Sequence, residues 1–385
     1  MNIIFKTFLS VVVFLAAQSA VAVQQVDIYT QSILVEKNAN ATRVSEVRRQ
    51  AMLQALQGAT LIYDVDKFAT IKSGLANHKQ YILSEKVNSS DEVFISVIGQ
   101  KIPMIELEIQ FDSKKLTQLL LKANISTLDT KRPETLAVIM VQHKDGTTQI
   151  LSRKYSVIQD DDGELDGQST QIGVEQSIED YELIAQKLTK DASALKLPVV
   201  WPIMDSQDLF FFDQRDFWQV DKERIVGFAK RYSVQIIMIA RIKEHDDGRF
   251  IGEWNVLDLG RPKVQYYNSL ELFTDAGLKQ LSQAVMQQYG INPNDNKDEQ
   301  VLVRMKQVDS VSGFHKNEVF LKGISGVKSV NALTVNGFEV TYILQLNVSQ
   351  KQFVSSLELT DGVDFLIEDE LRRPVMIDVV INNFE

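Results

Sequence analysis

The chain has 385 residues, of which 44% are hydrophobic and 24% are charged, a composition that excludes widespread disorder. Its net charge of −10 at pH 7 disfavours nucleic acid and anionic lipid head groups as partners, because both repel an acidic surface. The lack of cysteine excludes disulfide bonds and the lipid-carrying cysteine of a bacterial lipoprotein.

The first 22 residues have the three parts of a cleavable secretory signal. Lys6 supplies a positive charge, residues 7–17 form an apolar run, and residues 20–22 (AVA) offer a site for signal peptidase. The run is shorter than the ~20 residues that cross a bilayer, and no later segment approaches that length. We therefore expect export to the periplasm and a mature protein that begins at Val23, without a transmembrane span.

Residues 23–127 are predicted to form a first block of strands and helices. Apolar residues recur every three or four positions from Val44 to Leu56, which is typical of an amphipathic helix, and Gly58 marks its end. Strict alternation from Ile105 to Phe111 predicts a half-buried strand. The other expected elements are a strand at 26–28, a short helix from Asp64 that buries Phe68, Ile71 and Leu75, and a helix capped by Asp112.

Residues 133–291 are predicted to form a mixed sheet covered by helices. The uninterrupted apolar run 136–141 has the length of a central strand, and the polar stretch 143–177 is expected to be a surface insertion. The other expected elements are a helix over 181–188, a strand ending at Trp201, a helix from Asp221, strands at 234–240, 250–257 and 264–273, and a helix over 278–285.

A polar linker at 292–299 precedes a third block, 300–370, whose expected order is strand, helix, strand, strand, helix, strand. This is the βαββαβ order of a ferredoxin-like domain, and Asn336-Gly337 supplies the turn between its middle strands. The tail 371–385 contains a strand-like segment, 375–381, that either adds to a sheet edge or stays loose. The predicted fold class is therefore α+β, in three blocks.

The central block also carries a family pattern. Leu197-Pro198, then Pro202 to Asp208, then Phe217-Trp218 and the strand 233–240 resemble a family of uncharacterised Gram-negative envelope proteins, the domain of unknown function numbered twenty sixty-six. The resemblance covers residues 25–360; Gln235 and Ala240 replace the family's Asp and Gly, while Arg241 is retained. More loosely, the arrangement is similar to the TolB amino-terminal and curli-secretion accessory domains. The resemblance implies an envelope protein of mixed fold and supplies no catalytic residues.

Candidate catalytic groups are few. Catalysis at neutral pH usually needs a nucleophile, a tunable acid or base, or a metal. The chain has four scattered histidines without metal-ligand spacing, namely His78, His143, His245 and His315. The acidic run 160–166 departs from a calcium-binding loop, and Ser325 lacks the spacing of a nucleophile elbow. We therefore predict no catalytic, cofactor or metal site, and no enzyme.

Asp205 and Asp208 have two interpretations. Lying three residues apart beside Trp201 and Trp218, they are candidates for the paired acid and base of a hydrolase, or for a small-ligand site. Alternatively one of them caps a short helix after a proline-rigidified connection, which is the interpretation we favour.

The aromatic residues 210–212, Phe217 and Trp218 also leave two possibilities open: a plug in the core, or exposed anchors of a protein interface. The candidate interaction residues are Trp201, Asp205, Asp208, Phe211, Phe217, Trp218 and Arg241.

These patterns favour a non-catalytic periplasmic accessory or scaffold protein. Its expected partner is an envelope protein or peptidoglycan-associated machinery, bound without nucleic acid or any cofactor. Edge strands of open sheets offer one mode of docking, by strand addition. A hydrolase around Asp205 and Asp208 is the alternative function, and the ferredoxin-like block is a candidate dimerisation unit.

Overall fold

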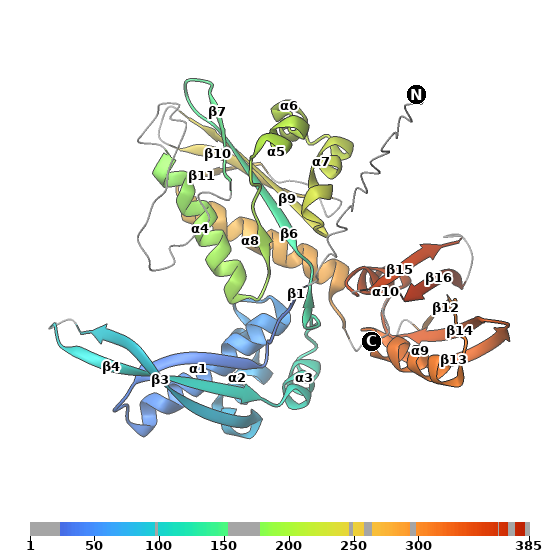
Figure 1. Ribbon diagram of the computed structural model, residues 1–385. Helices are drawn as coiled ribbons and strands as arrows, with labels where there is room; N and C mark the ends of the chain where they lie inside the picture. Colours follow the sequence, from blue (N-terminus) through green and yellow to red (C-terminus); the bar gives the residue numbers. More distant parts are fainter. Residues whose placement is uncertain are drawn as a thin grey trace, which may run out of the picture.

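The computed structural model describes residues 24–96, 99–152, 178–245, 249–257, 264–292, 298–360, 362–368 and 374–381. The predicted signal peptide, the acidic run 160–166 and most of the predicted linker lie outside these residues. The described residues form an α+β protein with four sheets, arranged in three blocks (Figure 1). The predicted fold class is confirmed. None of the described helices is long and apolar enough to cross a membrane.

The first block is a three-stranded antiparallel sheet covered by helices. Its elements are β1 (Gln24–Gln25), β2 (Thr30–Glu36), α1 (Ala41–Thr60), α2 (Ala69–Ala76), β3 (Ile82–Ile95), β4 (Lys101–Phe111) and α3 (Ser113–Lys122). The sheet order is β2-β4-β3, while β1 pairs elsewhere with β5 (Lys131–Arg132). The alternation predicted for β4 is confirmed, since Leu107, Ile109 and Phe111 are buried, and Asp112 caps α3 as predicted.

Three local predictions for this block are wrong. Residues 26–28 form no strand, because the Asp27 carboxylate accepts the N–H groups of Tyr29 and Thr30 and bends the chain. Gly58 lies inside α1, which continues to Thr60 and ends where Leu61 adopts a left-handed conformation. Phe68 precedes α2 and is 41% exposed, so it does not join Ile71 and Leu75 in the core.

The central block is a mixed sheet with helices on both faces. Its further elements are β6 (Thr135–Gln142), β7 (Thr148–Ile150), α4 (Ile178–Ala194), β8 (Val199–Val200), α5 (Ser206–Phe211), α6 (Gln214–Gln219), α7 (Lys222–Ala229), β9 (Ile236–Glu244), β10 (Phe250–Val256), β11 (Gln265–Tyr267) and α8 (Leu270–Tyr289). The strand order is β11-β10-β9-β6-β7, with β8 beside β6. One face of β6 contributes to the core with α4 and α8, and the other face to the core with α6 and α7, so the predicted central strand is confirmed.

Two predictions for this block are corrected. The strand expected over 264–273 is only three residues long, because Ser269 caps α8 and Phe273 therefore belongs to a helix, where it stacks on Trp254. The insertion expected from residue 143 begins as a hairpin: the His143 N–H donates to the Thr147 carbonyl, and β7 pairs with β6. Residues 153–177 of that insertion lie outside the described part of the chain.

The third block has the predicted order of elements and one additional strand. Its elements are β12 (Glu299–Met305), α9 (Val311–Gly323), β13 (Val327–Asn336), β14 (Glu339–Leu346), α10 (Gln350–Glu358), β15 (Val363–Ile367) and β16 (Val375–Ile381). The strand order is β13-β14-β12-β16-β15, and β16 runs parallel to β12. The prediction of an edge or loose tail is wrong, because the tail strand separates β12 from β15.

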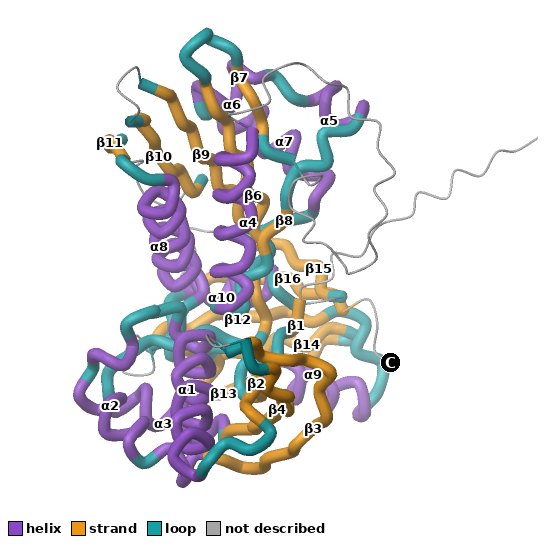
Figure 2. Tube along the Cα trace, turned by 90° about the vertical axis from the view of Figure 1, so that its left-hand side faces the viewer, coloured by secondary structure: helices purple, strands orange, loops and turns teal. Residues whose placement is uncertain are grey.

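The blocks meet around the end of α8, which lies beside α4 (Figure 2). Arg132, fully buried, donates to the carbonyl of Gly58 at 2.7 Å and so fixes β5 to α1. Gln352 of the third block donates to the carbonyl of Gly290 at the end of α8. Leu61 and Leu359, from the first and third blocks, pack in the central core. The three blocks therefore share parts of one hydrophobic interior.

Candidate functional site

Asp205 and Asp208 converge on one cation, Arg231. The guanidinium donates to both carboxylate oxygens of Asp205 at 2.6 Å each and to Asp208 at 2.7 Å. Asp208 is 1% exposed and also accepts hydrogen bonds from the N–H of Met204 and the hydroxyl of Tyr232. The sequence brings these groups together because α7 and the 3-10 helix after it return the chain to the start of α5.

The predicted cap is confirmed, with Asp205 as the capping residue. Its carboxylate accepts the N–H groups of Gln207 and Asp208 at the first turn of α5. Hydrogen bonds from Arg231, and then those backbone groups, hold the pKa of Asp205 well below its usual range. Both carboxylates therefore accept hydrogen bonds from groups of the protein itself. This arrangement is typical of a structural ion pair and not of an acid and base on either side of a substrate.

The aromatic cluster divides between core and surface. Phe217 is buried, stacks on Phe212 at a ring distance of 4.5 Å, and meets the edge of Phe228 at 5.1 Å. Phe210 and Phe211 instead point out of α5 and are 82% and 58% exposed. Phe217 thus belongs to the core, as the first possibility requires, while Phe210 and Phe211 are exposed and the interface role remains a prediction.

The remaining candidates have structural contacts. Trp201 is buried and donates its ring N–H to the hydroxyl of Thr189 at 2.9 Å. Arg241 donates to the carbonyl of Trp218, lies 6.0 Å from the centre of that indole ring and pairs with Glu253. Burial lowers the pKa of the Arg241 guanidinium. Of the seven predicted interaction residues, only Phe211 is more than half exposed.

An exposed strand that the sequence did not predict is the more extensive apolar surface. The β3–β4 hairpin projects from the first block, to the left in Figure 1. Among the described residues, β3 pairs only with β4, so its outer edge is open over fourteen positions. Five large apolar side chains on this strand are 46–64% exposed, namely Leu83, Val87, Val93, Phe94 and Ile95.

The base of the hairpin is fixed, while three of the five exposed apolar side chains, Val93, Phe94 and Ile95, lie in its outer half. Arg48 of α1 forms two hydrogen bonds with Glu85, at 2.6 and 2.8 Å, which ties β3 to the helix. The pairing is irregular between Ser89 and Val93, and β3 then pairs with β4 again as far as Ile95. A bulge and flanking charges commonly protect an edge strand, yet the three residues after this irregularity are all apolar.

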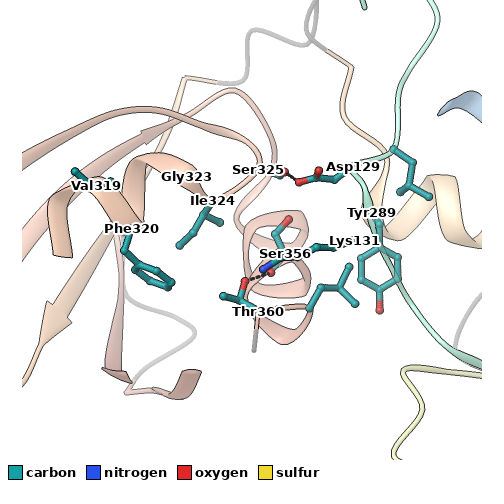
Figure 3. Close-up of a pocket in the computed structure, with 12 residues that line it drawn as sticks. Asp129, Lys131, Tyr289, Val319, Phe320, Gly323, Ile324, Ser325, Ser356 and Thr360 are labelled. Atoms are coloured by element: carbon teal, nitrogen blue, oxygen red, sulfur yellow. Dashed lines mark hydrogen bonds between the residues drawn. The ribbon is translucent and has the colours of Figure 1, made fainter. Parts of the chain in front are cut away.

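A small cavity of about 260 Å³ lies where the end of α8, the chain before β5 and the third block meet (Figure 3). In it the Ser325 hydroxyl donates to the carboxylate of Asp129. No histidine lines the cavity, and burial raises the pKa of Tyr289, so that its hydroxyl stays protonated. The bond from Ser325 to Asp129 links the third block to the chain before β5.

No metal site is formed by the described residues, which contain no group of three or more side chains placed to hold an ion. No known protein family, curated protein or solved structure matches this chain. The family resemblance described above therefore rests on its quoted residues alone.

Proposed function

We propose that this chain is a non-catalytic accessory protein of the bacterial periplasm that binds another envelope protein through the outer edge of β3. The observation that carries the proposal is a fourteen-residue strand, open along one edge and bearing five exposed apolar side chains. The export sequence predicted at residues 1–22 supports the compartment. Mass spectrometry of the protein from a periplasmic fraction tests this part and is expected to give a chain that begins at Val23.

The proposed mode of binding is strand addition, in which a strand of the partner pairs with the outer edge of β3. The outer edge of β3 presents backbone N–H and C=O groups that a partner strand can pair with, which supplies affinity. The apolar side chains supply further energy, because burying a large apolar side chain contributes roughly 1.5–3 kcal/mol and these are about half exposed. Without a partner, an unpaired strand edge of this length with exposed apolar side chains would favour aggregation.

The charges of the hairpin favour a protein over a membrane or nucleic acid. Between Ile82 and Phe111 the sequence has five acidic and two basic side chains. Anionic lipid and phosphate backbones attract clusters of lysine and arginine, so this excess of acids opposes both. A partner with exposed apolar residues and a basic rim fits the surface better.

Photo-crosslinking in intact cells tests the proposal. A photoreactive residue replaces Phe94 on β3, Phe211 on α5, or Phe338 at the turn between β13 and β14, which is an exposed phenylalanine on another hairpin. The expected result is one discrete protein adduct from position 94 and none from position 338. No adduct from position 94, or the same adducts from all three positions, would contradict the proposal. An adduct from position 211 alone would place the interface on α5 instead.

A further inference from the structure

A cleft of about 850 Å³ lies between the first and central blocks, and no residue of β3 lines it. Its floor is formed by α4 and α8, and its walls by the chain from Thr60 to Phe68 and by residues 124–126 after α3. The volume is in the range of small-molecule sites, which also occur preferentially between domains. Large apolar side chains that line it include Leu61, Ile62, Tyr63, Phe68, Leu278 and Met286.

The face of α8 that borders the cleft adjoins the face that packs in the core, and Leu278 belongs to both. Lining positions 275, 278, 279, 282, 283 and 286 recur at spacings of three and four and therefore share one side of the helix. Phe273, Leu281 and Val285 belong to the buried core and do not line the cleft. The exposed side chains of Tyr63 and Phe68 lie at this cleft, which explains why Phe68 is not in the core of the first block.

Ser282 is a buried polar group in the cleft without a partner. The residue is 5% exposed, and its hydroxyl makes no hydrogen bond to any described residue. A serine inside a helix often donates its hydroxyl to the carbonyl four residues earlier. The Ser282 hydroxyl makes no such hydrogen bond. Leaving a buried hydroxyl unpaired costs free energy, so the position calls for a ligand or solvent atom that bonds it.

Among the described residues that line the cleft, Lys279 is the cation that no carboxylate holds. Lys187 is held by Asp191 at 2.5 Å and by Asp275 at 2.9 Å, and Asp64 is held by Lys67 at 2.5 Å. Lys279 is exposed, lies one turn before Ser282 on the same face of α8, and makes no ion pair or hydrogen bond among the described residues. An anionic group bound at Ser282 could therefore pair with Lys279 without breaking an existing ion pair.

We propose that this cleft binds an amphiphile with one aliphatic chain and one carboxylate-like head. The head accepts a hydrogen bond from Ser282 and pairs with Lys279, while the chain lies against the apolar residues between α8 and the 60–68 segment. No lining residue of the cleft belongs to β3, so the proposal does not depend on the protein-binding function.

Isothermal titration of the purified full chain tests this site, with sodium dodecanoate and dodecyltrimethylammonium bromide as probes below their micellar concentrations. One dodecanoate is expected to bind per chain, and the cationic probe at least roughly tenfold more weakly, because the ion pair contributes to the first alone. Equal affinities for the two probes, or dodecanoate binding only near its micellar concentration, would overturn the proposal.

Two substitutions on α8 identify the residues. Lys279→Gln is expected to weaken dodecanoate binding roughly tenfold and Ser282→Ala roughly fivefold, because each removes one contact of the head group. Lys190→Gln, on an exposed position of α4 outside the cleft, is the matched control and should bind dodecanoate as the wild-type chain does. The same affinity in Lys279→Gln as in the control would overturn the assignment, and matching unfolding midpoints would show that each variant is folded.

Discussion

Phe94 of β3 lies opposite Ile102 of β4, in the outer half of the hairpin that projects from the first block. Beyond them Ser96 donates its N–H to the carbonyl of Gln100, and Gly99 adopts a positive φ of 79° that glycine accommodates without strain. The exposed apolar residues are thus held on a closed and paired hairpin rather than on a loose loop. A surface of this kind is ordered before a partner arrives, which lowers the entropic cost of binding.

Substitution of alanine for glycine is expected to have opposite effects on stability at two helical positions. A Cβ on Gly277 of α8 would lie 2.3 Å from the ring of Trp254, which is buried and held by stacking on Phe273. Overpacking of this kind costs about 1–3 kcal/mol, against a gain of about 1 kcal/mol in helix propensity, so Gly277→Ala should be destabilising.

The control is Gly227→Ala on α7, where a new Cβ would meet nothing within 4 Å. This change should stabilise the chain by up to about 1 kcal/mol, through helix propensity alone. Urea unfolding measures both variants. Equal effects of the two substitutions would be inconsistent with the close packing of α8 against Trp254.

The ion pairs of Arg231 predict a structural rather than a catalytic defect. Asp208→Ala leaves the hydroxyl of Tyr232 and the N–H of Met204 without their acceptor in a buried place, which should cost about 3 kcal/mol of unfolding free energy. Asp205→Ala removes a cap and a more exposed ion pair, so a smaller loss is expected. Urea unfolding at pH 7 compares the two. An Asp208→Ala variant as stable as the wild-type chain would contradict the structural role.

Part of this site is visible in the sequence and part is not. Asp205 is a predictable cap, because a cap depends on the few residues that follow it. Its partner Arg231 lies 26 residues away, and only the folded arrangement of α5 and α7 brings it near. β3 was missed because it is exposed on both faces: its serine, asparagine and acidic residues are typical of loops and give no alternation.

The burial of His78 leads us to expect a loss of folding stability in mild acid. The ring is buried, with Nδ1 at 3.2 Å from the carbonyl of Leu75 and Nε2 at 3.4 Å from the hydroxyl of Ser45. Burial, chiefly, together with the charges of Arg48, Lys79 and Arg49, lowers the pKa of His78 below its usual 6.5.

The unfolded chain therefore binds a proton at this residue at a higher pH than the folded chain does. The stabilising effect is present above about pH 6.5 and is lost as the pH falls toward the folded-state pKa, by at most about 1.4 kcal/mol per pH unit. Urea unfolding at pH 7 and pH 5 should show a smaller pH effect in His78→Gln than in the wild-type chain. Parallel pH dependences of the two proteins would rule out this contribution.

The central position of β16 predicts that the tail is required by the third block. Asp378 of β16 lies 2.7 Å from Arg304 of β12 and 2.7 Å from Lys306, the residue that follows β12. A chain truncated after residue 373 loses the strand between β12 and β15, so limited proteolysis should cut within residues 299–368. The three tryptophans lie in the central block, and their fluorescence should remain native as a control. Unchanged resistance to proteolysis would contradict a central β16.

The sequence predicts the strand β16 but not its position between β12 and β15 in the sheet. Residues 375–381 are apolar except for Asp378, which is typical of a strand buried on both faces. Its parallel pairing with β12 joins residues more than seventy positions apart, and no local pattern specifies such a pairing. A predicted βαββαβ order leaves β12 to pair directly with β15, so the additional strand emerges only from the fold.

Adduct formation from Val87, at the middle of the open edge of β3, is the most direct test of the proposed function. A photoreactive residue at position 87 should capture one envelope protein in intact cells. Phe94→Glu in the same chain should abolish that adduct, because a charge at the tip opposes burial there. Phe338→Glu, an equal change on another exposed hairpin, should leave the adduct unchanged. An adduct from Val87 that survives Phe94→Glu, or none in the parent chain, would contradict docking along β3.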